Sequence, residues 1–191
     1  MNARERILDG AEAVVETQGV GRLTLEAVAR AAGVSKGGVL YHFPGKEELT
    51  VAMIERFTAR FDGAVEGLAA EDAAAVGRTT RAYLRATLGE APTTGPNFDH
   101  ACASITAALA AYPEHLAQVR AQGGRWQARL ERDGLDPVLA TIIRLAIDGL
   151  WLGENLNLLR LAPETRRAVI ERLRAWTTGA EPALSRRKVP S

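Results

Sequence analysis

Apolar residues along this chain recur every three or four positions, the spacing that places them on one face of an α-helix. In residues 3–18, Ile7, Ala11 and Val14 follow this rhythm among charged side chains. Comparable patterns predict helices over 25–32, 36–43, 46–67, 77–90, 98–111, 113–133, 137–159 and 163–178. We therefore expect an all-α protein of about nine helices, with Val76 and Tyr83 buried along the helix at 77–90.

Local stop and start signals divide the stretch from 24 to 49 into two short helices and the beginning of a third. Thr24 and Ser35 each precede a helical segment and suit the N-cap position, where a side-chain oxygen accepts a backbone N–H. Gly33 lies between the two segments and allows the left-handed turn that crossed helices need. Pro44-Gly45 ends the second helix. These capping and turn residues together predict a helix-turn-helix.

The composition favours helices over strands, and the overall charge does not identify a class of partner. Alanine, leucine and arginine are frequent, and the formal net charge is only +1. The single cysteine, Cys102, excludes an internal disulfide framework and fits a reducing compartment. No apolar run is long enough to span a bilayer, so we expect a cytoplasmic protein.

The local charge balance of the helix-turn-helix is more informative. From 22 to 46 the chain carries four cations, Arg22, Arg30, Lys36 and Lys46, and one acid, Glu26. A small basic face suits contact with DNA phosphates, but it is too weak to bind DNA well alone. Two copies, one per half-site of a palindromic operator, are therefore expected.

Residues 5–50 resemble the N-terminal domain of the TetR family of bacterial repressors. The matching residues, in register and without a gap, are Thr24, Val28-Ala29, Ala32-Gly33-Val34-Ser35, Gly37, Tyr41, His42-Phe43 and Lys46. The resemblance implies a homodimeric repressor with a three-helix DNA-binding head and a helical ligand-binding and dimerisation domain. It also implies that DNA phosphates are bound by Thr24, Tyr41, His42 and Lys46. The residues it places at or in the major groove are Ser35, Lys36, Gly37 and Gly38.

The second helix of the helix-turn-helix, over 36–43, departs from the family pattern in two places. Leu40 stands where most members have tyrosine, and Gly38 replaces a residue that often carries a base-touching side chain. Glycines at 37 and 38 could mark a loop, or could let a phosphate backbone approach closely. We expect Lys36 and Tyr41 to carry more of the base readout, with operator shape contributing the rest. Phe43 and Val34 are expected in the core.

The segment 137–159 is the most apolar of the chain, and Asp136 can cap it. A helix apolar on more than one face must be covered on both sides. With the segment 163–178 it could form half of a four-helix bundle completed by a second subunit, where the family dimerises, or it could belong to an intrachain core. The interface residues we expect are Ile142, Leu145, Gly149, Leu152, Gly153, Leu156, Val169, Leu173 and Trp176.

Regulators of this type resemble one another in holding an apolar cavity among their middle helices. The residues we expect around it are Phe57, Phe61, Tyr83, Phe98, Cys102, Trp126, Asp148 and Trp151, each of which is individually more often a core residue. Asp148 could pair with Arg144, cap a neighbouring helix or meet a ligand. Cys102 could sense oxidants, but a lone cysteine among alanines is more often a small buried hydrophobe. The expected effector is small and largely apolar.

These features predict three regions: a DNA-binding domain over 1–48, an effector-binding and dimerisation domain over 49–182, and a mobile basic tail over 183–191. The histidines show no metal-ligand spacing, and catalytic motifs such as HExxH, CxxC and GxSxG do not occur. No cofactor or metal is expected. An enzyme that carries a chance helix-turn-helix is one alternative. A DNA-binding module that takes its signal from a protein partner is another.

Overall fold

The computed structural model describes residues 2–88 and 116–178, and within these ranges every regular element is helical. The all-α prediction is confirmed. The described helices are α1 (Ala3–Gln18), the short 3-10 helix η1 (Val20–Arg22), α2 (Leu25–Ala32), α3 (Lys36–His42), α4 (Lys46–Glu71), α5 (Arg78–Thr87), α7 (Leu116–Leu130), α8 (Pro137–Asn155) and α9 (Pro163–Trp176). None of them is long and apolar enough to cross a membrane.

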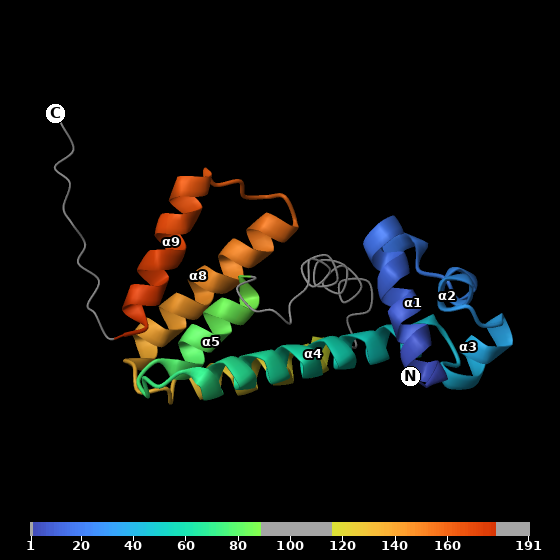
Figure 1. Cartoon of the computed structure of the whole chain (residues 1–191), viewed down its shortest axis with the longest axis horizontal. Helices are drawn as coiled ribbons and strands as arrows, with labels where there is room; N and C mark the ends of the chain where they lie inside the picture. Colours follow the sequence, from blue (N-terminus) through green and yellow to red (C-terminus); the bar gives the residue numbers. More distant parts are fainter. Residues whose placement is uncertain (1, 89–115, 179–191) are drawn as a thin grey trace.

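Helices α1, α2 and α3 form a small head at one end of the molecule, and α5, α8 and α9 form a body at the other (Figure 1). The predicted stripe of α1 is buried in the head core, with Ile7 and Ala11 at 0% exposure and Val14 at 2%. Helices α1 and α2 approach closely at Gly10. A Cβ there would lie only 2.8 Å from the amide nitrogen of Ala32.

Helix α4 runs from the head to the body as one continuous element of 26 residues (Figure 1). Its first turns contribute Leu49, Ala52 and Met53 to the head core. Its last turns contribute Val65 and Leu68 to the body core. Because side chains of this helix pack in both cores, its tilt relative to the body determines the position of the head.

The body core is built around α5, which packs against both α4 and α8. Asp133 caps the start of α5 through hydrogen bonds from the amides of Thr79 and Thr80, at 3.0 and 2.7 Å. Arg81 connects the α4–α5 linker to the end of α9, since it donates to the carbonyls of Ala74 and Thr177. These contacts hold α5 in a fixed position between the other helices of the body.

Several sequence predictions about element ends and burial need correction. Helix α7 ends at Leu130 rather than 133. Helix α4 continues to Glu71 rather than stopping near 67. Helix α8 ends at Asn155 rather than 159, because the amides of Leu158 and Leu159 fold back onto the carbonyl of Gly153. Val76 is 47% exposed, since it lies in the linker before α5.

Several predictions fall outside the described residues. These are the helix at 98–111, the start of the helix at 113, the basic tail at 183–191, and the pocket candidates Phe98 and Cys102.

Candidate functional site

The helix-turn-helix forms with the local geometry that its sequence predicts. The Oγ1 of Thr24 accepts the amide of Ala27 at 3.1 Å, and the Oγ of Ser35 accepts the amide of Gly38 at 3.0 Å. Gly33 adopts a left-handed conformation, with φ 64° and ψ 39°, at the C-terminal end of α2. Both capping predictions and the turn are confirmed. They position α3 at the outer surface of the head.

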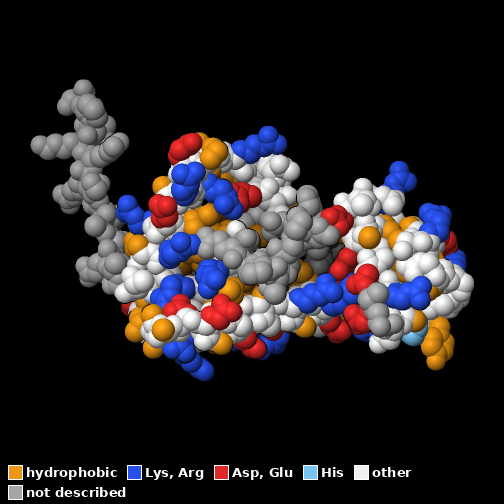
Figure 2. Space-filling model, in the orientation of Figure 1, with side chains coloured by type: hydrophobic (Ala, Val, Ile, Leu, Met, Phe, Trp, Pro, Cys, Tyr) orange, Lys and Arg blue, Asp and Glu red, His pale blue; other side chains and the backbone are white. Residues whose placement is uncertain are grey.

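One side of α3 is anchored in the head and the other is open. Val39 and Phe43 are buried at 0% and 3% exposure, which confirms that Phe43 is a core residue. Tyr41 is 84% exposed, and its ring meets that of His42 edge to face at 5.0 Å. In Figure 2, hydrophobic side chains and a histidine gather at the end of the head that α3 occupies, with Lys and Arg side chains nearby. The exposed side of α3 thus combines aromatic, cationic and hydrogen-bonding groups.

Lys36 makes a contact that the sequence pattern did not reveal. Its Nζ lies 2.5 Å from Oε1 of Glu26, and both side chains are more than half exposed. The hydrogen bond from Lys36, the backbone hydrogen bond at Glu26 and the lysine charge together lower the pKa of the Glu26 carboxyl. The only acid of the basic stretch therefore lies against one of its four cations.

The two glycines of α3 are not required by the packing of the head. A Cβ at Gly37 would find its nearest neighbour at 3.8 Å, and one at Gly38 would meet Ser35 Oγ at 3.4 Å. Both residues have ordinary helical backbone angles rather than positive φ. A methyl group would fit the fold at either position. The bare surface of α3 is available for a close approach by an external partner.

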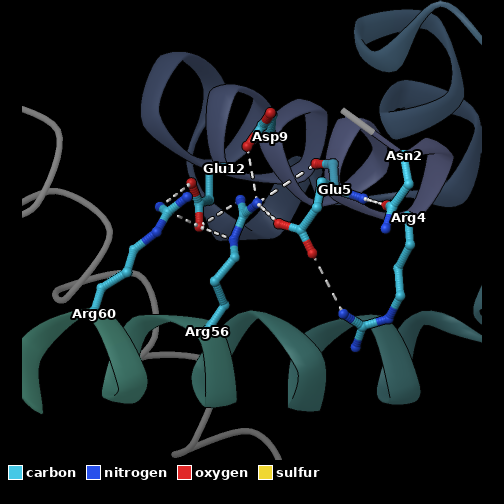
Figure 3. A network of polar contacts seen from close by, with 7 residues as sticks. All are labelled: Asn2, Arg4, Glu5, Asp9, Glu12, Arg56 and Arg60. Carbon is cyan, nitrogen blue, oxygen red and sulfur yellow. Dashed lines mark hydrogen bonds and ion pairs between the residues drawn. The ribbon is translucent and has the colours of Figure 1, made fainter. Parts of the chain in front are cut away.

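A buried arginine joins the head to α4. Arg56 of α4 reaches Glu5, Asp9 and Glu12, one turn apart along α1, and its side chain is only 10% exposed (Figure 3). Arg60, one turn further along α4, also contacts Glu12 at 3.1 Å but is 55% exposed. The acidic stripe of α1 and the Arg56/Arg60 pair each have helical spacing. That spacing is a usable signal in the sequence, but it does not show that the two stripes face each other.

Three of the predicted pocket residues come together in the body as an aromatic cluster. The ring of Phe61 lies 5.4 Å from that of Tyr83 and 5.7 Å from that of Trp126, in both cases edge to face. The Tyr83 hydroxyl donates to Asp148 at 2.7 Å, and the Trp126 indole donates to Asp62 at 2.9 Å. Burial, followed by the nearby Asp148 charge, raises the pKa of Tyr83. The polar ends of this cluster are satisfied within the chain.

Asp148 has the arginine partner that the sequence suggested. Its Oδ2 lies 3.3 Å from Nε of Arg144, one turn earlier in α8. Arg144 also donates to the carbonyl of Gly123 and to the side-chain oxygen of Gln127, both on α7. The Tyr83–Asp148–Arg144 chain therefore links α5, α8 and α7. Phe57 is half-buried on α4, and Trp151 packs at the edge of the body core.

The predicted dimer residues differ in how far they are exposed. Ile142, Leu145, Leu152 and Leu156 are 48%, 66%, 39% and 41% exposed, and with Val138 and Gly149 they form one stripe along α8. Gly153 and Leu173, in contrast, are covered by this chain's own side chains, Gly153 by Leu159. Val169 and Trp176 pack partly against the body core. An interface on α8 would therefore depend on the exposed stripe and not on Gly153 or Leu173.

Family models match both parts of the chain. One for bacterial regulatory proteins of the tetR family matches residues 7–53, and one for the C-terminal domain of tetracyclin repressor-like proteins matches residues 77–178. The chain belongs to the TetR family. It is therefore a DNA-binding transcriptional regulator and not an enzyme.

Curated relatives match part of the chain. The chain is 47% identical over 51 residues to the HTH-type transcriptional regulator SrpR of Pseudomonas putida, a match covering 27% of this chain and 24% of SrpR. The chain thus spans about a quarter of that relative's length.

Two solved structures match nearly the whole fold. A transcriptional regulator from Rhodococcus sp. Rha1 is 20% identical with a TM-score of 0.70, covering 93% of this chain and 95% of that one. The multidrug binding protein EbrR, complexed with ethidium, is 26% identical with a TM-score of 0.63, covering 90% of this chain and 98% of that one.

Proposed function

We propose that this TetR-family regulator is a repressor that binds a pseudo-palindromic operator as a homodimer and is released by a small molecule. The observation that carries the proposal is the continuity of α4. This helix packs in the head core through Leu49 and Met53 and in the body core through Val65 and Leu68. A change in the body that tilts α4 would move the head, and in a dimer it would change the separation of the two heads.

The exposed side of α3 supports the assignment of DNA contacts. In the proposed complex, Thr24, Tyr41, His42 and Lys46 hold phosphates, while Ser35, Lys36, Gly37 and Gly38 face the major groove. Thr24 and Ser35 already use their side-chain oxygens as caps, so each would contact DNA through its hydroxyl hydrogen or its backbone. Lys36 would exchange Glu26 for a DNA oxygen. The bare glycine surface favours recognition through close backbone approach and operator shape.

The exposed stripe of α8 supports the proposed dimer. Val138, Ile142, Leu145, Leu152 and Leu156 are separated by three, four or seven residues, and all are at least 39% exposed. A row of large apolar side chains with this spacing is unfavourable in water and suits packing against an identical helix. A two-fold contact between α8 helices would bury the stripe on both subunits, and it is the commonest symmetry of homo-oligomers.

The proposed effector acts on the body, within a domain that begins near 49 and follows a DNA-binding domain at 1–48. Structures of EbrR, 26% identical to this chain, were solved with ethidium and with malachite green. By analogy, a small, largely apolar molecule would bind beside Phe61, Tyr83, Trp126 and Asp148. To act on the heads, it must bind one dimer geometry more tightly than the other.

The test is selection of bound fragments from random DNA with the purified full chain, followed by sequencing. The proposal expects a pseudo-palindromic consensus with half-sites about one helical turn apart or a multiple of it. Titration of the selected DNA with ethidium or malachite green would follow, with release read by a fluorescently end-labelled duplex. A consensus without dyad symmetry contradicts the dimeric operator. A palindrome that neither dye releases limits the proposal to DNA binding.

A further inference from the structure

Leu40 is a large apolar side chain on the exposed side of α3. It is 39% exposed, beside Tyr41 at 84%. It is not part of the buried head core, which Val39 and Phe43 of the same segment enter instead. A single exposed leucine is common on protein surfaces and indicates nothing by itself. The place of Leu40 on α3 is what makes it informative.

Leu40 lies within the surface that α3 presents to solvent. The exposed residues of this helix are Lys36, Gly37, Leu40 and Tyr41. At about 100° of rotation per residue, they fall within an arc of roughly 140°. In an α-helix a side chain leans toward the N-terminus, over the residues three and four positions earlier. For Leu40 these residues are Gly37 and Lys36, so its aliphatic side chain borders a lysine and a bare glycine.

The surface next to Leu40 is open. Because Gly37 has no side chain, this surface is lowered to the helix backbone. A Cβ built at Gly37 would have its nearest neighbour, the Oγ of Ser35, at 3.8 Å. A group the size of a methyl can therefore lie over Gly37 and touch the side chain of Leu40.

The chemistry of leucine excludes most kinds of DNA contact. Leu40 has no hydrogen-bond donor or acceptor in its side chain, so that side chain binds neither a phosphate oxygen nor the polar edge of a base. Among the four bases, thymine alone presents an apolar group in the major groove, its C5 methyl. That methyl group is the part of a base edge that suits an aliphatic side chain next to a glycine.

We propose that Leu40 is a specificity-determining residue that packs against the C5 methyl group of a thymine in each operator half-site. The methyl group lies over Gly37, and the side chain of Leu40 shields it from water. This inference rests on the proposed placement of α3 in the major groove. It adds to that placement a base position that is read by apolar contact, beside those that Lys36 and Tyr41 read.

The experiment replaces the thymines of the selected operator with deoxyuridine, one symmetric pair at a time. Deoxyuridine lacks only the C5 methyl group and keeps the hydrogen-bonding groups of thymine. Fluorescence anisotropy with the full chain measures the affinity for each duplex. The result expected is a pair of positions at which the substitution lowers affinity about fourfold per half-site, the effect of one buried methyl-sized group.

Variants of Leu40 assign this loss to its side chain. In Leu40→Ala the thymine and deoxyuridine duplexes should bind equally well. Leu40→Asn, similar in size but polar, should give the same result and carries the test if the alanine variant does not fold. Leu158→Ala is the matched control, because Leu158 is 78% exposed and lies beyond the end of α8. It should keep the full difference between the two duplexes.

Two results overturn the proposal while leaving DNA binding in place. One is an affinity that deoxyuridine leaves unchanged at every position, and the other is a loss that persists in both Leu40 variants. Lys46→Ala separates these results from a failure of the proposed function, because it should still weaken binding to the same duplexes. If the chain selects no DNA at all, the proposed function and this inference are both wrong.

Discussion

The guanidinium of Arg56 lies 2.8 Å from Oδ1 of Asp9, between a helix of the DNA-binding head and the helix that leads to the body. Glu5 and Glu12 complete the set of carboxylates around it, at 3.2 and 2.7 Å (Figure 3). Burial lowers the pKa of Arg56, but hydrogen bonds and charge from Glu12, Asp9 and Glu5 outweigh it, so the net shift is upward. The contact therefore ties the head to α4 at every pH at which these carboxylates are ionised.

Replacing Arg56 with Gln should destabilise the protein by about 2 kcal/mol, because three carboxylates lose a nearly buried partner. Arg60→Gln is the matched control, one turn away on the same helix. It should cost less than about 1 kcal/mol, since Arg60 is 55% exposed and, among the described residues, its ion pair is with Glu12 alone. Urea unfolding followed by circular dichroism measures both variants. Equal losses of stability would show that the buried position of Arg56 has no special importance.

Replacing Gly37 with Ala should separate folding from DNA binding. The nearest atom to a Cβ at this position is 3.8 Å away, so the fold accepts it, and alanine should add up to about 0.5 kcal/mol of helix stability. Affinity for the selected operator should fall, because in the proposed complex the added methyl group would lie where the phosphate backbone or the groove floor approaches. Thermal unfolding and fluorescence anisotropy give the two readouts. Unchanged DNA affinity would contradict close approach at α3.

Lys46→Ala should weaken binding to specific and random DNA alike, and should lower the slope of log affinity against log salt by about one unit. Tyr41→Ala should also weaken binding strongly, since its exposed side chain is assigned to a phosphate. The control is Arg132→Ala, which removes an exposed cation from the body. Gel-shift titrations over a range of salt measure all three. The assignment of this face is wrong if neither head variant differs from the parent.

Leu145→Asp should convert the proposed dimer to a monomer. Its side chain is 66% exposed in the middle of the α8 stripe, and a carboxylate there would be buried without a partner. Leu158→Asp is the control, because Leu158 is 78% exposed but lies beyond the end of α8. Sedimentation at micromolar concentration distinguishes the two species. A dimer that survives Leu145→Asp would place the interface elsewhere.

The Asp72–Arg81 pair should contribute stability that is lost in acid. The hydrogen bond from Arg81, assisted by the Ala74 amide, lowers the pKa of Asp72. A carboxyl whose folded pKa is depressed adds stability above its unfolded pKa, near 4, and loses it as the pH falls through the folded value. Asp72→Asn should therefore destabilise the protein at pH 7 and have little effect near pH 2. Chemical unfolding at both pH values tests this, and an equal loss at both would contradict it.

Much of the DNA-binding head was predictable from local sequence. The Thr24 and Ser35 caps and the Asp136 cap of α8 each involve an amide three residues away, so their signals lie within a single turn. The register of the family motif then identified the exposed side of α3. The ligand pocket stays a prediction. The structure brings three of its expected residues, Phe61, Tyr83 and Trp126, together, but the hydrogen bonds from Tyr83 to Asp148 and from Trp126 to Asp62 could not be read from the sequence.

By itself, the sequence determined the helical class, most of the described helix starts and the family, because caps, turns and hydrophobic periodicity depend on neighbours within a few residues. Only the tertiary structure decided how distant groups meet. Arg56 reaches Asp9 across 47 positions, and Tyr83 reaches Asp148 across 65. Such contacts depend on where whole helices pack, and the polar residues that make them show the same helical spacing as an ordinary solvated face.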